Sequence, residues 1–183
     1  MSTILSDEVF FTFAGLIDQQ ATQRVFNNFA VAVNGKAKRI HLLIQSAGGM
    51  VGDGIAIYNY LRNLPVELIT YNSGSVLSIG VIMYLSGKIR KATRNATFLI
   101  HKTTCTPQAP VTADAIKHRT RSIELDDKNI DSILHDHIEM PGSNWDLRDK
   151  FDLTISAEEA IAFKLVHEIA DFAPPPGFQI YNI

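Results

Sequence analysis

The chain has 183 residues and a mass of 20.3 kDa, which is the size of one domain. Apolar residues make up 46% of it, so a sizeable core can form. Its 17 Lys and Arg against 19 Asp and Glu give a formal charge of −2, which argues against nucleic acid and anionic membranes as partners. The single cysteine, Cys105, excludes an internal disulfide and a cysteine-based zinc site.

The N-terminal residues do not form a signal peptide. They read MSTILSDEVFF, with acidic residues where a signal would need a basic and then an apolar run. The longest apolar stretch, residues 79–85, is far shorter than the ~20 residues of a membrane span. We therefore expect a protein of the cytoplasm, where a lone cysteine also stays reduced.

Strand-like runs alternate with helix-like runs over the first hundred residues. We expect strands at 9–13, 39–45, 66–71, 89–92 and 97–100, helices at 18–33, 55–61 and 78–85, and a turn at 72–75. This alternation is typical of an α/β protein with parallel strands and right-handed crossovers.

Beyond residue 110 the sequence becomes strongly polar. Residues 112–138 predict one long charged helix with few apolar positions, which either projects from the body or packs on another subunit. Ser156 and Glu159 have the spacing of a helix capping box. The prolines of residues 174–176 cannot continue a helix, so the chain is expected to end extended.

Two glycine- or serine-bearing segments follow predicted strands and precede predicted helices. Residues 46–49 (SAGG) are neither a phosphate-binding loop nor a dinucleotide fingerprint, so they indicate either a tight turn or an anion-holding loop. Ser78 lies in an apolar run, where it is either a helix cap or a nucleophile at a strand-to-helix turn. The ordinary GxSxG elbow is not present, because Val occupies position 76.

Histidine and aspartate residues complete the candidate set. His101 ends a predicted strand and is either structural or a proton-transfer group. Three acidic residues, Asp146, Asp149 and Asp152, precede the capping box. His135 and His137 are two apart on a predicted helix and so face different directions, which favours surface positions over a metal site.

Taken together, five segments in order resemble the proteolytic subunit of ATP-dependent Clp proteases, the ClpP family. They are residues 15–18 (GLID), residues 44–49 (IQSAGG) with 54–58 (GIAIY), residues 74–80 (GSVLSIG), residues 98–101 (FLIH), and residues 152–160 (DLTISAEEA) with 165–166 (LV). The corresponding family patterns read I-N-S-P-G-G with G-x-x-I-Y, G-Q-A-A-S-M-G, M-I-H, and D-R-F-L-S-A-x-E-A with G-L-V-D. The likeness covers residues 9–169 at nearly the family's spacing.

The resemblance implies a ClpP/crotonase-like α/β fold of repeated strand-strand-helix units with a projecting handle helix. A single peptidase domain would span residues 1–172, with the handle at about 102–140 and a Pro-rich tail at 173–183. It assigns Ser78 as nucleophile, His101 as general base and Asp152 as the residue that orients it. It assigns the oxyanion-hole N–H groups to Gly49 and Ile79.

The implied activity is a serine endopeptidase acting on unfolded polypeptides through an acyl-enzyme, without metal or organic cofactor. The family implies a homo-oligomeric ring, heptameric or doubled, fed by an AAA+ ATPase. Two departures are notable: few residues precede Val9, where the family has long loops, and residues 102–110 bear two prolines that would interrupt the family's ring-pairing strand. Two other interpretations stay open, a crotonase-type enzyme on acyl-CoA and a non-catalytic ring subunit.

Overall fold

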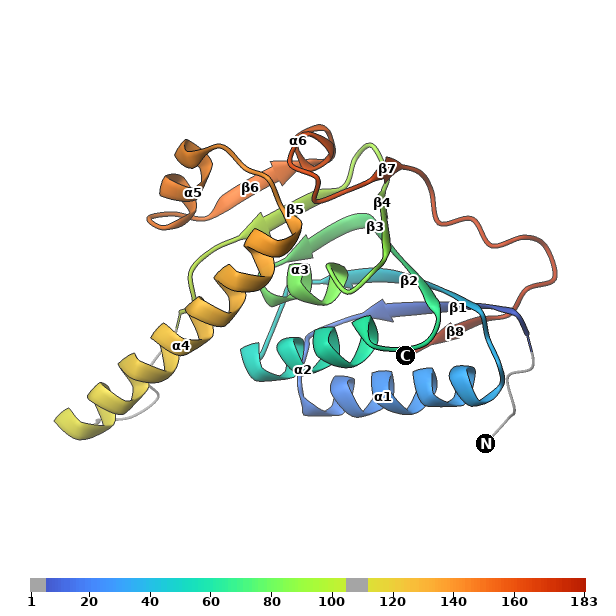
Figure 1. The fold of residues 1–183 in the computed structure, drawn as a ribbon, viewed down its shortest axis with the longest axis horizontal. Coiled ribbons are helices and arrows are strands. Elements are labelled where there is room, and N and C mark those ends of the chain that lie inside the picture. Colours follow the sequence, from blue (N-terminus) through green and yellow to red (C-terminus); the bar gives the residue numbers. More distant parts are fainter. Residues whose placement is uncertain (1–5, 105–111) are drawn as a thin grey trace.

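A mostly parallel sheet forms the centre of the protein, which the computed structural model describes over residues 6–104 and 112–183 (Figure 1). Its strand order is β6-β5-β3-β2-β1-β8, with β4 pairing both β3 and β7. All described pairs are parallel except β5 with β6. The strands are β1 (Glu8–Ala14), β2 (Arg39–Ser46), β3 (Glu67–Leu77), β4 (Ile89–Ala92), β5 (Thr97–Ile100), β6 (Leu153–Ser156), β7 (Glu168–Ile169) and β8 (Ile180–Asn182). The expected α/β class is confirmed.

The first three helices lie along one face of the sheet (Figure 1). The helices are α1 (Gln19–Asn34), α2 (Val51–Arg62), α3 (Ile79–Tyr84), α4 (Ala113–His137), α5 (Gly142–Arg148) and α6 (Ala157–Ala162). Asp18 caps α1 by accepting a hydrogen bond from the Ala21 N–H, as the sequence predicts. The capping box of Ser156 and Glu159 at α6 is also confirmed.

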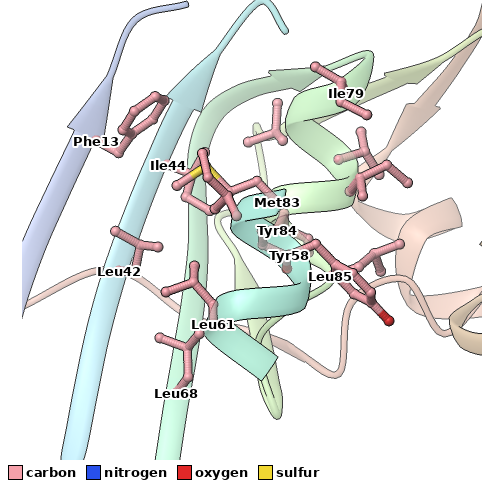
Figure 2. Close-up of a cluster of buried hydrophobic side chains, with 14 of the residues drawn as sticks. Phe13, Leu42, Ile44, Tyr58, Leu61, Leu68, Ile79, Met83, Tyr84 and Leu85 are labelled. Carbon is pink, nitrogen blue, oxygen red and sulfur yellow. The ribbon is translucent and has the colours of Figure 1, made fainter. Parts of the chain in front are cut away.

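The core lies between β1–β3 and the helices α2 and α3 (Figure 2). Strand side chains with period-two spacing face this layer, among them Leu42, Ile44 and Leu68, and all three are buried. At the α2–α3 contact, a Cβ built on Gly54 would lie 2.3 Å from Cγ1 of Ile79. The missing side chain therefore lets α3 approach α2 closely, which sets the position of the helix that follows Ser78.

Strand β3 is longer than the sequence predicts, because it changes partners along its length. Its first half pairs with β4, and its last residues pair with β5. The Asn72 side chain stabilises the change, donating to the Thr97 carbonyl at 2.9 Å and accepting from the Gly74 N–H at 3.0 Å. The turn expected at 72–75 is therefore wrong: these polar residues lie within the strand, where it bends from one neighbour to the next.

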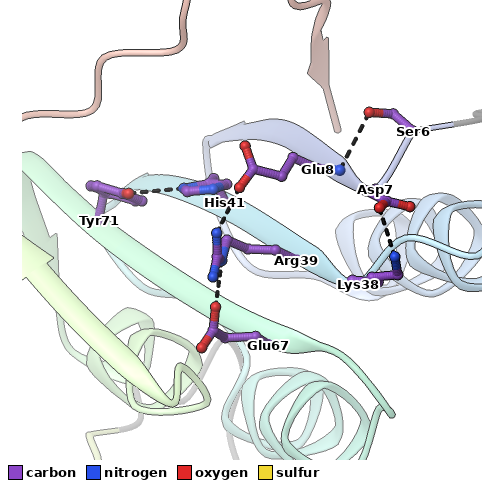
Figure 3. A network of polar contacts seen from close by, with 8 residues as sticks. All are labelled: Ser6, Asp7, Glu8, Lys38, Arg39, His41, Glu67 and Tyr71. Atoms are coloured by element: carbon purple, nitrogen blue, oxygen red, sulfur yellow. Dashed lines mark hydrogen bonds and ion pairs between the residues drawn. The ribbon is translucent and has the colours of Figure 1, made fainter.

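Ionic contacts link the amino-terminal ends of β1, β2 and β3 (Figure 3). Arg39 bonds both Glu8 and Glu67, and these residues are also its partners in the strand register. Both carboxylates raise the pKa of Arg39, Glu67 more than Glu8. The contacts are exposed and screened by solvent, so they favour the register of β1, β2 and β3 more than they add stability.

The tail after β7 ends extended, as expected. It runs around the sheet, and β8 pairs in parallel with β1, with Phe10 opposite Ile180 (Figure 1). Phe172 and Phe178 both contact the Phe10 ring edge-on, with ring centroids 6.0 and 5.2 Å away. The tail thus covers part of the sheet face that the helices leave open.

Helix α4 projects from the body (Figure 1). It begins after Thr112, whose side chain accepts from the Ala115 N–H, and it spans 25 residues as the sequence predicts. Residues 113–122 are all exposed, and only Ile130 and Leu134 are buried. Ile130 and Leu134, at the end of α4 nearest the body, therefore pack on the body, while residues 113–122 add nothing to the hydrophobic core.

An ion cluster fastens the base of α4 to the body. Asp131 accepts hydrogen bonds from Lys102 at 2.7 Å and from Arg148, whose side chain is only 1% exposed. Asp149 lies 3.3 Å from the Lys102 ammonium. Burial alone would raise the pKa of Asp131, but the hydrogen bonds from Lys102 and Arg148 outweigh it and leave the pKa lowered. The carboxylate form of Asp131 is therefore the one that stabilises the fold.

We predict that Asp131→Asn lowers the free energy of unfolding at pH 7 by about 1–3 kcal/mol, because the buried Arg148 loses its charged partner. Because the folded pKa of Asp131 lies below its unfolded value, its contribution is lost as pH falls through the folded pKa. The difference between variant and wild type should therefore shrink below about pH 4, as measured by urea unfolding at several pH values.

Asp114→Asn is the control, because Asp114 is exposed on the same helix and pairs with Lys117 only at 3.7 Å. It should change stability little at any pH. A loss in Asp131→Asn that stays constant down to pH 3 would contradict the ionic origin of the effect.

Candidate active site

Ser78 lies at the junction of β3 and α3 in a sparsely populated backbone conformation. Its φ is 55° and its ψ is −131°, and its N–H donates to the Leu99 carbonyl of β5 at 2.7 Å. Such a conformation costs of order 1–3 kcal/mol and is held by the surrounding structure. Although Ser78 stands at the N-cap position of α3, its side chain makes no capping hydrogen bond. Of the two alternatives for Ser78, the capping role is therefore excluded.

His101 follows β5 and lies beside Ser78. Leu77 pairs with Leu99 in the parallel register of β3 and β5, so residues just past both carboxyl ends meet at one edge of the sheet. The His101 Nε2 lies 2.9 Å from the Ser78 Oγ. Its Nδ1 lies 2.6 Å from the Lys102 carbonyl oxygen, which can only accept a hydrogen bond. The proton of a neutral ring is thus on Nδ1, which leaves Nε2 free to accept from the serine hydroxyl.

The loop after β2 supplies the wall opposite Ser78. A Cβ at Gly48 would lie 2.7 Å from the Ser78 Cβ, and a Cβ at Gly49 would lie 2.1 Å from the Ile17 carbonyl oxygen. Both glycines also have positive φ, 97° and 153°. A side chain would collide with Ser78 at position 48 and with the Ile17 backbone at position 49, which explains why both residues of the pair are glycine.

The geometry also fixes the direction of two backbone N–H groups. The Gly48 carbonyl accepts a hydrogen bond from the Ile17 N–H at 2.9 Å. The peptide that joins Gly48 to Gly49 is trans, so the Gly49 N–H points away from Ile17, opposite to that carbonyl. Ile79 is the first residue of α3, so its N–H lies beyond the reach of that helix's own carbonyls. Gly49 and Ile79 both line the cavity that contains Ser78 and His101.

This catalytic cavity has a volume of about 70 Å³ and a largely apolar wall. The apolar lining comes from α2, α3, β5 and the base of α4: Val51, Ile79, Ile82, Ile100, Ile130 and Leu134. Thr103 and Thr104 close it from the loop after His101. The contribution of α4 was not predicted from the sequence. The available signal was the pair Ile130 and Leu134, which are four residues apart and so share one face of the helix.

Asp152 makes no hydrogen bond to the other two candidate residues, although it directly precedes Leu153, which pairs with Ile100 in the antiparallel register of β5 and β6. It is exposed just before β6, and the His101 Nδ1 is held by the Lys102 carbonyl rather than by a carboxylate. Asp149 contacts Lys102, and Asp146 is exposed on α5. The structure therefore brings together Ser78, His101, Gly49 and Ile79, and it places Asp152 next to His101 in the strand register without a hydrogen bond between them. The Lys102 carbonyl was missed because a main-chain group has no sequence signal.

His137 is not the surface residue that the sequence indicated. It is half-buried, its Nε2 lies 2.8 Å from the Tyr58 hydroxyl, and burial lowers its pKa to about 4. His135 is exposed and stacks on Trp145. Among the described residues, no group of three or more His, Cys, Asp and Glu side chains is placed to hold a metal ion. Nor does any helix in the described ranges have the length and apolar character needed to span a membrane.

Comparison with known proteins gives one consistent family. The Clp protease family model matches residues 1–172. The chain is 27% identical over 178 residues to the ATP-dependent Clp protease proteolytic subunit of Deinococcus radiodurans, covering 93% of this chain and 83% of the relative. It is 28% identical over 103 residues to the subunit of the same name from Bdellovibrio bacteriovorus, covering 55% of this chain and 49% of that relative. With a match over nearly its whole length, the chain belongs to the Clp protease family of serine-type peptidases.

Proposed function

We propose that this chain is an endopeptidase in which Ser78 is the nucleophile and His101 the general base. The 2.9 Å contact between the Ser78 Oγ and the His101 Nε2 carries the proposal. A serine hydroxyl is a weak nucleophile until a neighbouring base accepts its proton, and this distance is within hydrogen-bond reach. The strained backbone at Ser78 adds support, since such strain clusters at active sites.

In the proposed reaction, the Ser78 Oγ attacks the substrate carbonyl while its proton passes to the His101 Nε2. The N–H groups of Gly49 and Ile79 then hold the oxyanion of the tetrahedral intermediate. His101 returns the proton to the leaving amine, and an acyl-enzyme remains on Ser78. Water activated by the same histidine hydrolyses this ester and restores the enzyme.

Asp152 is the proposed third member of the triad, carried over from the family pattern. A carboxylate at the His101 Nδ1 would stabilise the imidazolium that forms during attack. In this structure the Lys102 carbonyl holds that proton, so Asp152 would have to displace it when substrate or another subunit binds. The Lys102 carbonyl and the Asp152 carboxylate are thus alternative acceptors for the His101 Nδ1 proton. Substitution of Asp152 tests which of them acts in the working enzyme.

The substrate side chain next to the cleaved bond is proposed to be apolar and of modest size. The wall of the catalytic cavity offers aliphatic side chains, and its volume is about 70 Å³. An unfolded polypeptide is the proposed substrate class, because a cavity this recessed needs a chain that can extend into it.

We also propose that the chain assembles with other copies of itself. The outer half of α4 exposes Ile116 and Leu125, 52% and 50% accessible, on a helix that buries little in the single chain. A second subunit would give this handle a partner. By family likeness we propose a homo-oligomeric ring, heptameric or doubled, fed by an AAA+ ATPase in the cytoplasm.

We predict that Ser78→Ala lowers peptidase kcat at least about 1,000-fold, because no other hydroxyl replaces the nucleophile. The measurement is cleavage of a fluorogenic peptide with an apolar residue before the cleaved bond. Ser132→Ala, an exposed serine on α4, is the matched control and should keep wild-type rates. Equal activity in Ser78→Ala and wild type would overturn the proposed function.

We predict that Asp152→Asn lowers kcat by about 100-fold or more with little change in KM, if its carboxylate stabilises the imidazolium in the working enzyme. Asp146→Asn, an exposed neighbour on α5, should have no such effect. A loss below about tenfold in Asp152→Asn would remove Asp152 from the triad and assign the orientation of His101 to the Lys102 carbonyl.

A further inference from the structure

A second hollow adjoins the catalytic cavity, between the start of α2 and the handle helix. This outer groove has a volume of about 320 Å³ and shares Gly49, Val51, Thr103 and Thr104 with the catalytic cavity. Four residues of α4 also line it: Arg119, Ser122, Ile123 and Asp126. A peptide whose side chain fills the catalytic cavity would therefore continue into the outer groove along α4.

The wall shared by the catalytic cavity and the outer groove contains an unsatisfied polar group. The Thr103 hydroxyl is buried and has no hydrogen-bond partner within the described residues. An unpaired buried hydroxyl costs free energy, and main-chain N–H and C=O groups of an extended peptide would satisfy it. Thr103 borders both hollows, so its hydroxyl lies where the peptide would cross from one to the other.

The spacing of α4 residues matches the repeat of an extended peptide. Ile130 lines the catalytic cavity, and Asp126, four residues earlier, lines the outer groove. Four residues of helix rise about 6 Å. Two residues of extended chain rise about 6.6 Å and return the side chain to the same face. The side chain two residues away from the one in the catalytic cavity would therefore face Asp126.

Asp126 is the acidic residue that lines the outer groove, whereas its neighbours Asp127 and Asp131 are engaged elsewhere. Asp127 accepts from the Thr103 N–H at 2.8 Å, and Asp131 is paired with Lys102 and Arg148. Asp126 is partly buried, and no ion pair or hydrogen bond engages its side chain among the described residues. Residues 105–111, which lie outside that part of the chain, contain no Lys, Arg or His that could pair with it.

We propose that Asp126 selects substrates with a Lys or Arg side chain two residues from the apolar residue in the catalytic cavity. The inference rests on the proposed peptidase function and extends it to a second substrate position. A carboxylate with no internal cation, partly withdrawn from water, gains most from a cation that the substrate brings. Arg119, seven residues and two turns further out, faces a more distant part of the groove.

The test uses peptides that share one apolar residue at the cleaved bond and carry Lys, norleucine or Glu at successive positions on either side. For wild type, we expect kcat/KM of the Lys peptide to exceed that of the norleucine peptide about three- to tenfold at a position two residues from the apolar one. The gain should come through KM and fade in high salt, since the pair is accessible to solvent.

Two substitutions of Asp126 and one control show whether the Lys preference depends on the charge of residue 126 or on the shape of the groove. Asp126→Asn should abolish the Lys preference, and Asp126→Lys should replace it by a preference for Glu. Asp114→Asn, exposed on the same helix and outside the groove lining, should keep the wild-type preference. A Lys preference that survives in both Asp126 variants would overturn the assignment.

The failure of this inference differs from the failure of the proposed function. If the norleucine peptide is cleaved in wild type and not in Ser78→Ala, but Lys gives no gain at any position, the peptidase stands and the Asp126 subsite is wrong. If no peptide is cleaved faster by wild type than by Ser78→Ala, the proposed function itself is wrong.

Discussion

The parallel pairing of β3 with β5 is the constraint on which the active site depends. It sets Leu77 opposite Leu99, so the residues that follow, Ser78 and His101, leave the sheet at the same edge. The Ser78 N–H still donates to the Leu99 carbonyl of β5, and this hydrogen bond holds the strained backbone of Ser78. A slip of one residue would turn the side chains to opposite faces and separate the two groups.

Close packing around this edge leaves little freedom for the nucleophile. Gly48 and Gly49 bring the β2 loop against Ser78 and Ile17, and Gly54 brings α2 against Ile79. Each glycine lacks the side chain that would collide there, so the loop, Ser78 and the first turn of α3 form one closely packed unit. Such a unit can hold two N–H donors at fixed positions, which is what stabilising an oxyanion requires.

The handle contributes to the site as well as to the shape of the molecule. Ile130 and Leu134 at its base close the catalytic cavity, and Asp131 ties it to Lys102, the residue after the candidate base. In the outer half, residues 113–122 are all exposed within the part of the chain that the structure describes. A partner that moved α4 would therefore act on the cavity wall and on the loop that bears His101, so the proposed assembly would be coupled to the proposed catalysis through these contacts.

The strands at 9–13 and 39–45 were predictable because their apolar patterns are strong and local, and the helix at 112–138 was predictable from its long, uninterrupted polar run. Ser78, His101 and the glycine pair were candidates from the sequence because each follows a predicted strand, and the structure places them at one cavity. The turn expected at 72–75 was wrong because its polar residues serve a change of strand partner, which is a tertiary event. For the same reason the sequence could not reveal that the Lys102 carbonyl, and not the Asp152 carboxylate, is hydrogen-bonded to the His101 Nδ1.

The most direct test of the account is covalent labelling with a fluorophosphonate, followed by peptide mass spectrometry. Such a probe reacts with a serine hydroxyl only when a base activates it. The account predicts an adduct on Ser78 in the wild-type chain and at least about a hundredfold slower labelling in His101→Ala. Labelling of another serine, or a rate at Ser78 that does not change in His101→Ala, would contradict the claim that these two residues form the catalytic pair.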